Sequence, residues 1–264
     1  MAGVVCSSIG NRLGNQMCVI SAGLSFAKKY DKDFVITSPY HTNLNSPGYT
    51  EYNWITDRFK WVVFHETSDF IKIKEGKRQE IINTDKYSDC ENVIFVGVFN
   101  SDKYYDREYV RKVFCNTDDD NQRISGKYGD LNGFVSLSVR RGDFLNYKST
   151  FICPSKEWYE KCYKKYFDGR DLLITGDDLN WCRDNFDFGK GKMLFLEHED
   201  AVETLKIKQI CKNHIIPPST YSWWSAYLSG DDSTVVVPDM WFTKSSGIDS
   251  EGKYLDNWIR EKLI

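Results

Sequence analysis

The sequence predicts an α/β protein built from two doubly wound, Rossmann-like halves. Predicted strands and helices alternate along most of the 264 residues, which is the pattern of parallel sheets covered by helices. The first predicted strand enters a turn that contains Gly10 and Gly14 before a helix begins, as in nucleotide-binding α/β folds. The chain is also long enough for two units of about 130 residues each.

The first half opens in the order strand, helix, strand. Val4–Val5 is a predicted strand, and the apolar residues after it recur at helical spacing until Lys28 and Lys29, which suit a helix end. The region from about Pro39 to Ser88 is less regular, with a short predicted strand at Trp61–Phe64. The other predicted elements of this half are the strands Phe34–Thr37 and Val93–Phe99 and the helix Tyr109–Phe114.

The second half shows a clearer alternation of short apolar runs and helical segments. The predicted strands are Phe134–Val139, Leu172–Asp178, Met193–Leu196, a strand beginning at His214, and Thr234–Phe242. The predicted helices are Lys156–Tyr166, Asn180–Asn185, Ala201–Lys212, Tyr221–Gly230 and a closing helix at Tyr254–Leu263.

The two halves are expected to join within residues 116–132. Asn116–Gln122 holds three consecutive aspartates and is predicted to be a solvated surface loop, where a metal site is disfavoured. We therefore expect one domain at residues 1–125 and a second at residues 126–264.

Composition and charge exclude several classes of protein. A net charge of −3 without a Lys/Arg stripe argues against a nucleic-acid partner. The longest apolar run, Val93–Phe99, is shorter than the roughly 20 residues that span a bilayer, and the N-terminus lacks the pattern of a signal peptide. The eight cysteines form no CxxC and the four histidines no HxxxH, so we expect reduced thiols, no metal centre and a cytoplasmic protein.

Three polar clusters follow predicted strands of the second half. Ligands of parallel α/β sheets bind at the carboxyl ends of the strands. Paired guanidinium groups, such as those of Arg140 and Arg141, bind phosphate oxygens. The cluster Ser219-Thr220-Tyr221 opens a predicted helix, and the free N–H groups at a helix start favour anions. Together the clusters predict a diphosphate site. They are Arg140-Arg141-Gly142-Asp143, Asp177-Asp178 and Ser219-Thr220-Tyr221.

Each cluster also has a simpler interpretation. Arg140 and Arg141 can form a surface salt bridge with Asp143 and a neighbouring acid. Asp177 and Asp178 can shape a turn and cap a helix, and Ser219 with Thr220 can be a plain helix cap. Trp223 and Trp224 are predicted to pack in the core rather than to stack on a sugar.

The turn Gly10–Gln16 matches neither GxGxxG nor GxxxxGK[ST], so the sequence predicts neither a classical dinucleotide site nor a P-loop. Asn15 and Gln16 near the helix start are in a position to reach a ligand between the halves. The alternative is that the asparagine caps its own helix.

Several motifs resemble those of the α-1,2-fucosyltransferase family, glycosyltransferase family 11, in the same order. They are RLGNQM, SVRRGD, LLITGDDLNWC, ICKNHIIPPSTYSWWSAYL and VVVPDMWF. The resemblance covers nearly the whole chain and is densest over Phe134–Phe242. It implies a GT-B-like fold of two Rossmann-like domains facing a cleft, with residues 1–125 on the acceptor side and residues 126–264 binding the nucleotide sugar. It also implies transfer of L-fucose from GDP-fucose with inversion, without a cofactor or a required metal.

Carried over by position, the resemblance assigns roles to the clusters. Arg140 and Arg141 are expected to hold the β-phosphate and stabilise the leaving GDP. Asp177 and Asp178 are expected near guanine or ribose. The remaining expected binding residues are Ser219, Thr220 and Tyr221 at the diphosphate, and Asn15 and Gln16 at the cleft from the acceptor-side domain.

The sequence departs from the family pattern at three places. Ser138 replaces a histidine that in relatives helps to hold guanine, so it is a candidate binding residue with altered chemistry. Pro218 replaces an asparagine before the two hydroxyl residues. Ile207-Lys208 replaces an apolar Leu-Met pair.

We therefore expect an inverting glycosyltransferase that moves L-fucose to a glycan hydroxyl, such as the 2-hydroxyl of a galactose, with Asp143 as a candidate base. One alternative is the same fold with another donor, GDP-rhamnose or GDP-mannose. The other is a non-catalytic protein that binds a glycan or a nucleotide. The expected partners are a nucleotide-sugar donor and a glycan acceptor, with the acceptor surface within about Pro39–Ser88.

Overall fold

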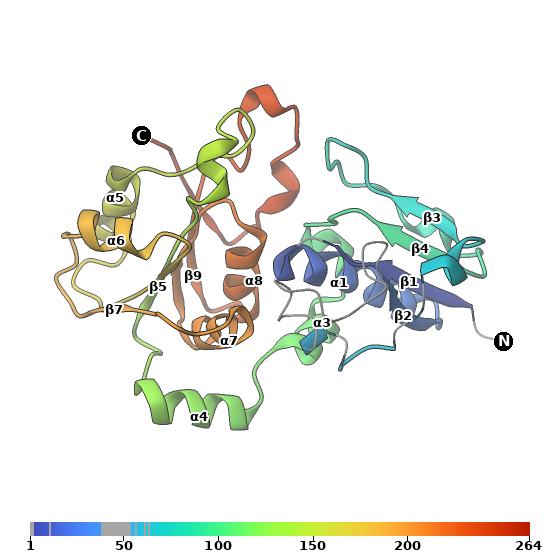
Figure 1. The fold of residues 1–264 in the computed structure, drawn as a ribbon, viewed down its shortest axis with the longest axis horizontal. Helices are drawn as coiled ribbons and strands as arrows, with labels where there is room; N and C mark the ends of the chain where they lie inside the picture. The colour runs from blue at the N-terminus through green and yellow to red at the C-terminus, as the bar shows by residue number, and fades with distance from the viewer. Residues whose placement is uncertain (1–2, 11, 38–53, 56, 61, 63) are drawn as a thin grey trace. The chain divides into compact units, whose positions relative to one another are not determined.

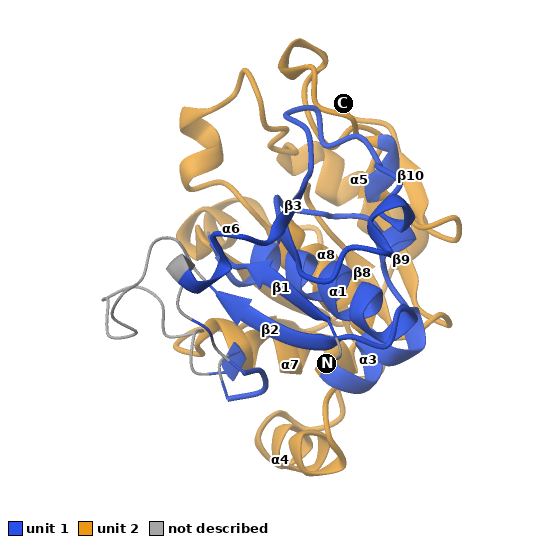
Figure 2. Cartoon of the chain, turned by 90° about the vertical axis from the view of Figure 1, so that its right-hand side faces the viewer, with its two compact units in different colours: residues 1–113, 251–253 blue, residues 114–250, 254–264 orange. Residues whose placement is uncertain are grey.

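The computed structural model describes residues 3–10, 12–37, 54–55, 57–60, 62 and 64–264. The chain divides into two compact units (Figures 1 and 2). Unit 1 comprises Met1–Val113 with Glu251–Lys253, and unit 2 comprises Phe114–Ser250 with Tyr254–Ile264. Each unit has its own parallel sheet, which confirms the predicted α/β class with two sheets.

Unit 1 contains a four-stranded sheet in the order β2-β1-β4-β3, in which all described pairings are parallel. Helix α1 packs on β1, where the Ser7 hydroxyl donates a hydrogen bond of 2.8 Å to the Val19 carbonyl. Gly23 of α1 also lies at this contact. A Cβ at residue 23 would stand 2.3 Å from Ser7 Oγ, so the close packing of α1 on β1 requires a glycine there. The elements are β1 (Val4–Ser8), α1 (Leu13–Lys29), β2 (Asp33–Thr37), β3 (Ile71–Lys74), β4 (Val93–Val96) and α3 (Arg107–Phe114).

Unit 2 contains a six-stranded parallel sheet in the order β10-β9-β8-β5-β6-β7. Its strands are β5 (Val135–Val139), β6 (Leu172–Gly176), β7 (Met193–Phe195), β8 (Asn213–Ile215), β9 (Thr234–Pro238) and β10 (Ile259–Glu261). Its helices are α4 (Asp118–Tyr128), α5 (Lys156–Tyr166), α6 (Leu179–Asn185), α7 (Ala201–Ile210) and α8 (Thr220–Leu228).

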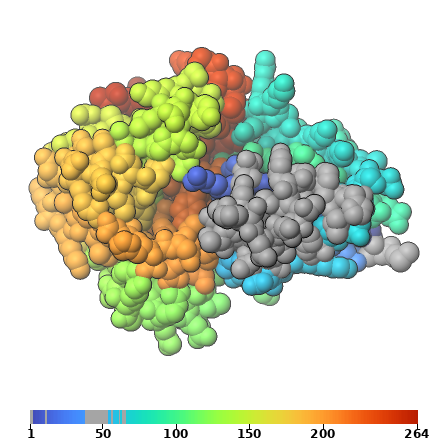
Figure 3. Space-filling view, viewed as in Figure 1, coloured from blue at the N-terminus to red at the C-terminus, as the bar shows by residue number. Residues whose placement is uncertain are grey.

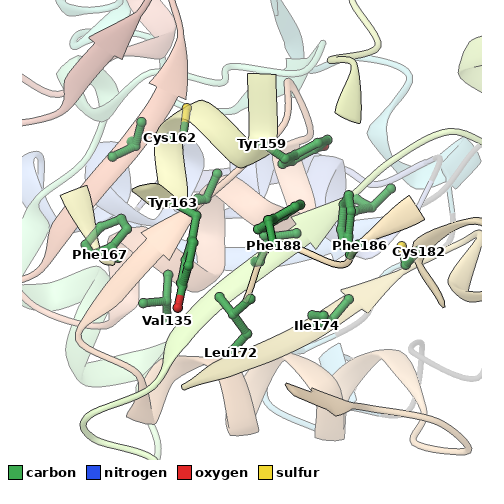
Figure 4. Close-up of a cluster of buried hydrophobic side chains, with 14 of the residues drawn as sticks. Val135, Tyr159, Cys162, Tyr163, Phe167, Leu172, Ile174, Cys182, Phe186 and Phe188 are labelled. Atoms are coloured by element: carbon green, nitrogen blue, oxygen red, sulfur yellow. The ribbon is translucent and has the colours of Figure 1, made fainter. Parts of the chain in front are cut away.

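Helices cover both faces of the sheet of unit 2, as the doubly wound prediction requires. On one face, alternate residues of β5 pack against aromatic side chains of α5 and of the segment after α6 (Figure 4). The buried residues of this cluster include Val135, Leu137, Tyr159, Tyr163, Leu172, Ile174, Phe186 and Phe188. On the other face, Leu173 of β6 packs with Ile207 of α7 and Ile124 of α4.

The predicted surface loop at Asn116–Gln122 is wrong, because most of it belongs to α4. Thr117 and Asp120 form a capping box, in which each side chain bonds to the backbone N–H of the other residue. The same Asp120 carboxylate accepts a hydrogen bond of 2.6 Å from Lys206 of α7. These contacts place α4 in unit 2, on its surface beside α7 (bright green below orange in Figure 3). The compact units therefore divide between residues 113 and 114, before the expected boundary at 125/126.

The predicted closing helix at Tyr254–Leu263 is also wrong. A short 3₁₀ turn at Glu251–Lys253 precedes this segment, and the segment itself contains the edge strand β10, which pairs with β9. Glu261 of β10 lies against α5, where Lys161, Lys165 and Tyr166 contact its carboxylate. Partial burial opposes ionisation, but these hydrogen bonds lower the pKa of Glu261 to about 2. The strand is stabilised by long-range contacts that its local pattern does not encode.

The face of β5 opposite the aromatic cluster is polar. Ser136 of β5 lies beside His214 of β8 in the sheet register, and both side chains are fully buried. Lys208 of α7 is buried on the same side, with no exposed surface. Within the part of the chain that the structure describes, Lys208 Nζ, His214 Nδ1 and Ser136 Oγ have no hydrogen-bond partner. A buried amine without a partner destabilises a fold.

Replacing Lys208 by Met should therefore stabilise the protein. We expect the free energy of unfolding to rise by about 1–3 kcal/mol near neutral pH, because an unsatisfied buried donor is removed at similar side-chain volume. Burial lowers the pKa of Lys208 from 10.5 to about 7. Between pH 7 and pH 10.5 the unfolded chain therefore binds more protons than the folded chain. In this range the free energy of unfolding of the wild type rises with pH, and its difference from that of Lys208→Met shrinks.

Urea unfolding at several pH values measures this difference. The matched control is Lys192→Met at an exposed position of the same unit, which should change stability by less than about 0.5 kcal/mol. A Lys208→Met protein that is less stable than the wild type at neutral pH would contradict the interpretation of Lys208 as a buried amine that lacks a hydrogen-bond partner.

Candidate functional site

The three polar clusters of unit 2 lie at the carboxyl ends of three neighbouring strands. In the sheet, β5 stands between β6 and β8, and all three run in the same direction. The chain builds outward from β5 to β6 and β7 on one side and then to β8, β9 and β10 on the other. The strand order therefore reverses between β5 and β8, and such a switch point is the usual ligand site of an open α/β sheet.

Arg140 directly follows β5 and makes two ion pairs. Its Nη2 lies 2.5 Å from Asp143 Oδ1, and its Nη1 lies 2.8 Å from Asp177 Oδ2 at the end of β6. The guanidinium group also lies 5.2 Å from the centre of the Phe144 ring. Its side chain is only 18% exposed, so its orientation is set by these neighbours.

Arg141 is held by different contacts. Its Nε donates a hydrogen bond of 3.2 Å to Asp178 Oδ2, and its guanidinium carbon lies 3.9 Å from the centre of the Trp181 ring in α6. Asp178 also caps α6, because its Oδ1 accepts a hydrogen bond from the Trp181 amide. Trp181 was not among the predicted site residues. Its position three residues after the capping aspartate is the feature that places it over Arg141.

Asp177 connects the two arginines. Its Oδ2 pairs with the Arg140 side chain, and its Oδ1 accepts a hydrogen bond of 2.8 Å from the Arg141 amide. Gly142 permits this approach, because a Cβ at that residue would stand 2.6 Å from Asp177 Oδ2. In this structure Asp177 and Asp178 thus make the contacts of the simpler interpretation: both pair with the arginines, and Asp178 caps a helix.

The arginines retain the capacity to bind an anion. A guanidinium group has five N–H donors, and the contacts above use two of Arg140 and one of Arg141. The carboxylates act as orienting groups, which hold the two planar donors at the carboxyl edge of β5. A phosphate group is a suitable ligand for such an arrangement.

The third cluster begins α8, after β8. Ser219 is the cap residue, its side chain makes no capping bond, and its carbonyl accepts a hydrogen bond of 2.8 Å from the Trp223 amide. Thr220 is the first residue of the helix. The Tyr221 hydroxyl donates to the Ala201 carbonyl at the start of α7, so Tyr221 joins the beginnings of the two helices. The start of α8 lies at the same sheet edge as the arginines.

Ser138 lies inside the sheet of unit 2. It is 2% exposed, and its hydroxyl lies 3.4 Å from that of Thr175, its register partner in β6. The candidate binding role of Ser138 stays a prediction.

Asn15 and Gln16 belong to unit 1. They are the third and fourth residues of α1, whose cap residue is Arg12, so Asn15 does not cap the helix. Gln16 is fully buried. Their expected role toward an acceptor stays a prediction, and residues 39–53, 56, 61 and 63 of the expected acceptor region lie outside the described part of the chain.

Trp223 and Trp224 are fully buried, as predicted. The Trp223 ring stacks on Tyr227 at 4.6 Å and lies edge-on to Trp224 at 5.2 Å. These rings are core residues of α8.

Two thiols near the arginines are neutral at physiological pH. The Cys153 thiol donates to the Arg140 carbonyl, and burial raises its pKa despite the nearby Arg141. Burial raises the pKa of Cys182 to about 12. Since the thiolate is the nucleophilic form, neither residue is prepared for covalent catalysis. All eight cysteines are free thiols.

The described residues contain neither a metal-binding cluster nor a membrane-spanning helix. No group of three or more His, Cys, Asp or Glu side chains there is arranged to hold a metal ion. No helix in the same residues is long and apolar enough to cross a membrane.

Solved structures of similar fold include two fucosyltransferases. POFUT1 in complex with GDP-fucose is 11% identical, with a TM-score of 0.47 over 87% of this chain and 95% of that one. NodZ from Bradyrhizobium is 13% identical, with a TM-score of 0.49 over 85% and 93% of the two chains. At this level of similarity neither structure bears on the activity of this chain.

Curated relatives match shorter parts of the sequence. An alpha-1,2-colitosyltransferase from Escherichia coli is 25% identical over 183 residues, 64% of this chain and 62% of that protein. The O-antigen biosynthesis glycosyltransferase WbnK from Escherichia coli is 33% identical over 136 residues, 47% and 43% of the two. Galactoside alpha-(1,2)-fucosyltransferase 1 of Leontopithecus chrysomelas is 27% identical over 154 residues, 51% and 40%. The matches thus span between 40% and 62% of the length of these relatives.

A family model gives the broadest sequence match. The model described as glycosyl transferase family 11 matches residues 59–262, which include every strand of unit 2 and all three polar clusters. The match covers well over half of the sequence and agrees with the motif resemblance. The chain belongs to glycosyl transferase family 11.

Proposed function

We propose that this protein is an inverting glycosyltransferase that moves L-fucose from GDP-fucose to a hydroxyl of a glycan acceptor, the 2-hydroxyl of a galactose or a similar sugar. Family membership supports sugar transfer, and the names of several relatives specify alpha-1,2 transfer of fucose or colitose. The observation that carries the proposal is the oriented pair Arg140 and Arg141 at the switch point of the sheet, beside the start of α8.

The chemistry of transfer explains why two guanidinium groups are needed. As the bond between the sugar C1 and the phosphate oxygen breaks, positive charge develops on the sugar and negative charge on the leaving diphosphate. Arg140 and Arg141 stabilise that negative charge without transferring a proton, and the N–H groups at the start of α8 add to the effect. We propose that these groups suffice and that the reaction is independent of metal ions.

Asp143 is the candidate base. Its carboxylate is 51% exposed, and one of its oxygens, Oδ1, pairs with Arg140. The second oxygen is proposed to accept the proton of the attacking hydroxyl, while the first keeps Arg140 in place. The loose transition state of glycosyl transfer demands only a weak base.

Asp177 and Asp178 are proposed to act mainly by orienting the arginines, because Asp177 contacts both of them and Asp178 contacts Arg141. Ser219, Thr220 and Tyr221 are proposed to receive the diphosphate, and Ser138 to lie beneath the base. Asn15 and Gln16 are proposed to contact the acceptor from unit 1. We also propose that the protein acts in the cytoplasm.

A different donor sugar is the second candidate. The relative named an alpha-1,2-colitosyltransferase matches the largest share of this chain among those described above. The motif resemblance also implies a histidine at the position of Ser138, so we propose that contacts at the nucleotide differ from those in relatives. Competition among GDP-fucose, GDP-mannose and GDP-rhamnose in a binding assay ranks the donors.

Removing either arginine should abolish most of the activity. We expect Arg140→Ala and Arg141→Ala to lower the rate of fucose transfer, or of GDP-fucose hydrolysis, by on the order of 10²–10³. Release of GDP is the measurement, and circular dichroism checks the fold. Arg183→Ala is the matched control, since Arg183 makes an exposed ion pair with Glu197 in the same unit. Turnover at the wild-type rate in both site variants would rule out this site.

Gly142→Ala tests the geometry without removing a charge. The added Cβ would displace Asp177, which holds both arginines, so we expect a loss of activity of about tenfold or more with KM for the donor raised. Gly133→Ala is the control, because a Cβ there meets no atom within 4 Å. Equal kinetics in the two variants would show that Asp177 does not need its observed position.

A further inference from the structure

Lys208 is a buried, positively ionisable residue that the mechanism above does not use. Its side chain has no exposed surface, and Nζ has no hydrogen-bond partner among the described residues. An amine in this condition costs stability, so its presence calls for a physical reason.

The amine is directed toward the start of α8. Lys208 Nζ lies 5.0 Å from the centre of the Tyr221 ring, and Tyr221 is the second residue of that helix. The Tyr221 hydroxyl is bound to the Ala201 carbonyl at the start of α7. Lys208 therefore lies between the two helices, behind the N-terminal turn that is proposed to receive the diphosphate.

The ionisable groups around Lys208 do not compensate a positive charge. Cys211, near the end of α7, stays a neutral thiol because burial raises its pKa to about 12. Burial and the nearby Lys208 lower the pKa of His214 in β8 to about 3, so this ring is also neutral. Lys208 also faces the Tyr221 ring, whose π face favours a cation. Burial lowers the pKa of Lys208 itself to about 7.

We propose that Lys208 takes up a proton when an anionic diphosphate binds at the start of α8, and that the resulting ammonium group strengthens the binding. This inference rests on the proposed function of the site. Lys208 acts through the helix and not by contact with the reacting atoms, so it is a positioning residue and not a catalytic one.

The proton balance is simple. The neutral amine accepts one proton from the buffer acid, becomes an ammonium group over the Tyr221 ring, and leaves the buffer base in solution. An opposite charge within roughly 10 Å in a protein interior raises the pKa of an amine by on the order of one unit. Binding should thus raise the pKa of Lys208 above its value in the free protein, and the affinity should fall as pH rises.

Calorimetric titration with GDP in two buffers of different ionisation enthalpy measures this uptake directly. Near pH 8 the free amine is mostly neutral while the phosphates of GDP, which titrate near pH 6, are fully ionised. We expect uptake of up to one proton per GDP, and a loss of affinity of up to about tenfold between pH 7 and pH 9. Guanosine, which has no phosphate, should bind without proton uptake.

Two variants separate Lys208 from other groups. Lys208→Met should bind GDP without proton uptake and with an affinity that no longer changes over this pH range. Lys206→Met is the control, because Lys206 is on the same helix and pairs with Asp120. It should retain both effects.

The outcomes distinguish the two proposals. GDP binding with no proton uptake in the wild type, or with equal uptake in Lys208→Met, would overturn the role of Lys208 and leave the proposed function standing. Failure of GDP to bind the wild type at any pH would overturn the proposed function, and the role of Lys208 with it.

Discussion

The bridge that Asp177 makes between Arg140 and Arg141 is the interaction on which the candidate site depends. One carboxylate at the end of β6 holds the side chain of the first arginine and the backbone of the second. Without it, two adjacent guanidinium groups would repel each other and spread into solvent. The close approach requires a glycine at residue 142. The parallel pairing of β5 with β6 brings these residues together at the switch point of the sheet.

Much of this arrangement was predictable from the sequence because it depends on local patterns. Short apolar runs ending in polar residues indicated β5 and β6, and parallel strands place their carboxyl ends at one edge. The predictions failed where local pattern and tertiary contacts disagree. Three aspartates suggested a loop, but Thr117 and Asp120 cap a helix there. The final segment has helical spacing, yet pairing with β9 and the bonds between Glu261 and α5 make it a strand.

Side-chain partners were the least predictable part of the site. The sequence suggested a salt bridge of the arginines with Asp143 and a neighbouring acid. It did not identify Asp177 and Asp178 as the further partners, nor did it show that Trp181 covers Arg141. These contacts depend on the direction of side chains across two strands and a helix. The environment of Lys208 was unpredictable for the same reason. The groups that face Lys208 come from α7, α8 and β8, which meet only in the folded unit.

The central claim is that Arg140 and Arg141 bind the diphosphate of a guanine nucleotide sugar. Calorimetric titration of the wild type and of Arg141→Ala with GDP, GDP-fucose and UDP tests it most directly. The account predicts that GDP and GDP-fucose bind the wild type, that UDP binds much more weakly, and that Arg141→Ala loses most of the affinity. Unchanged GDP-fucose binding by Arg141→Ala, or a preference of the wild type for UDP, would contradict it.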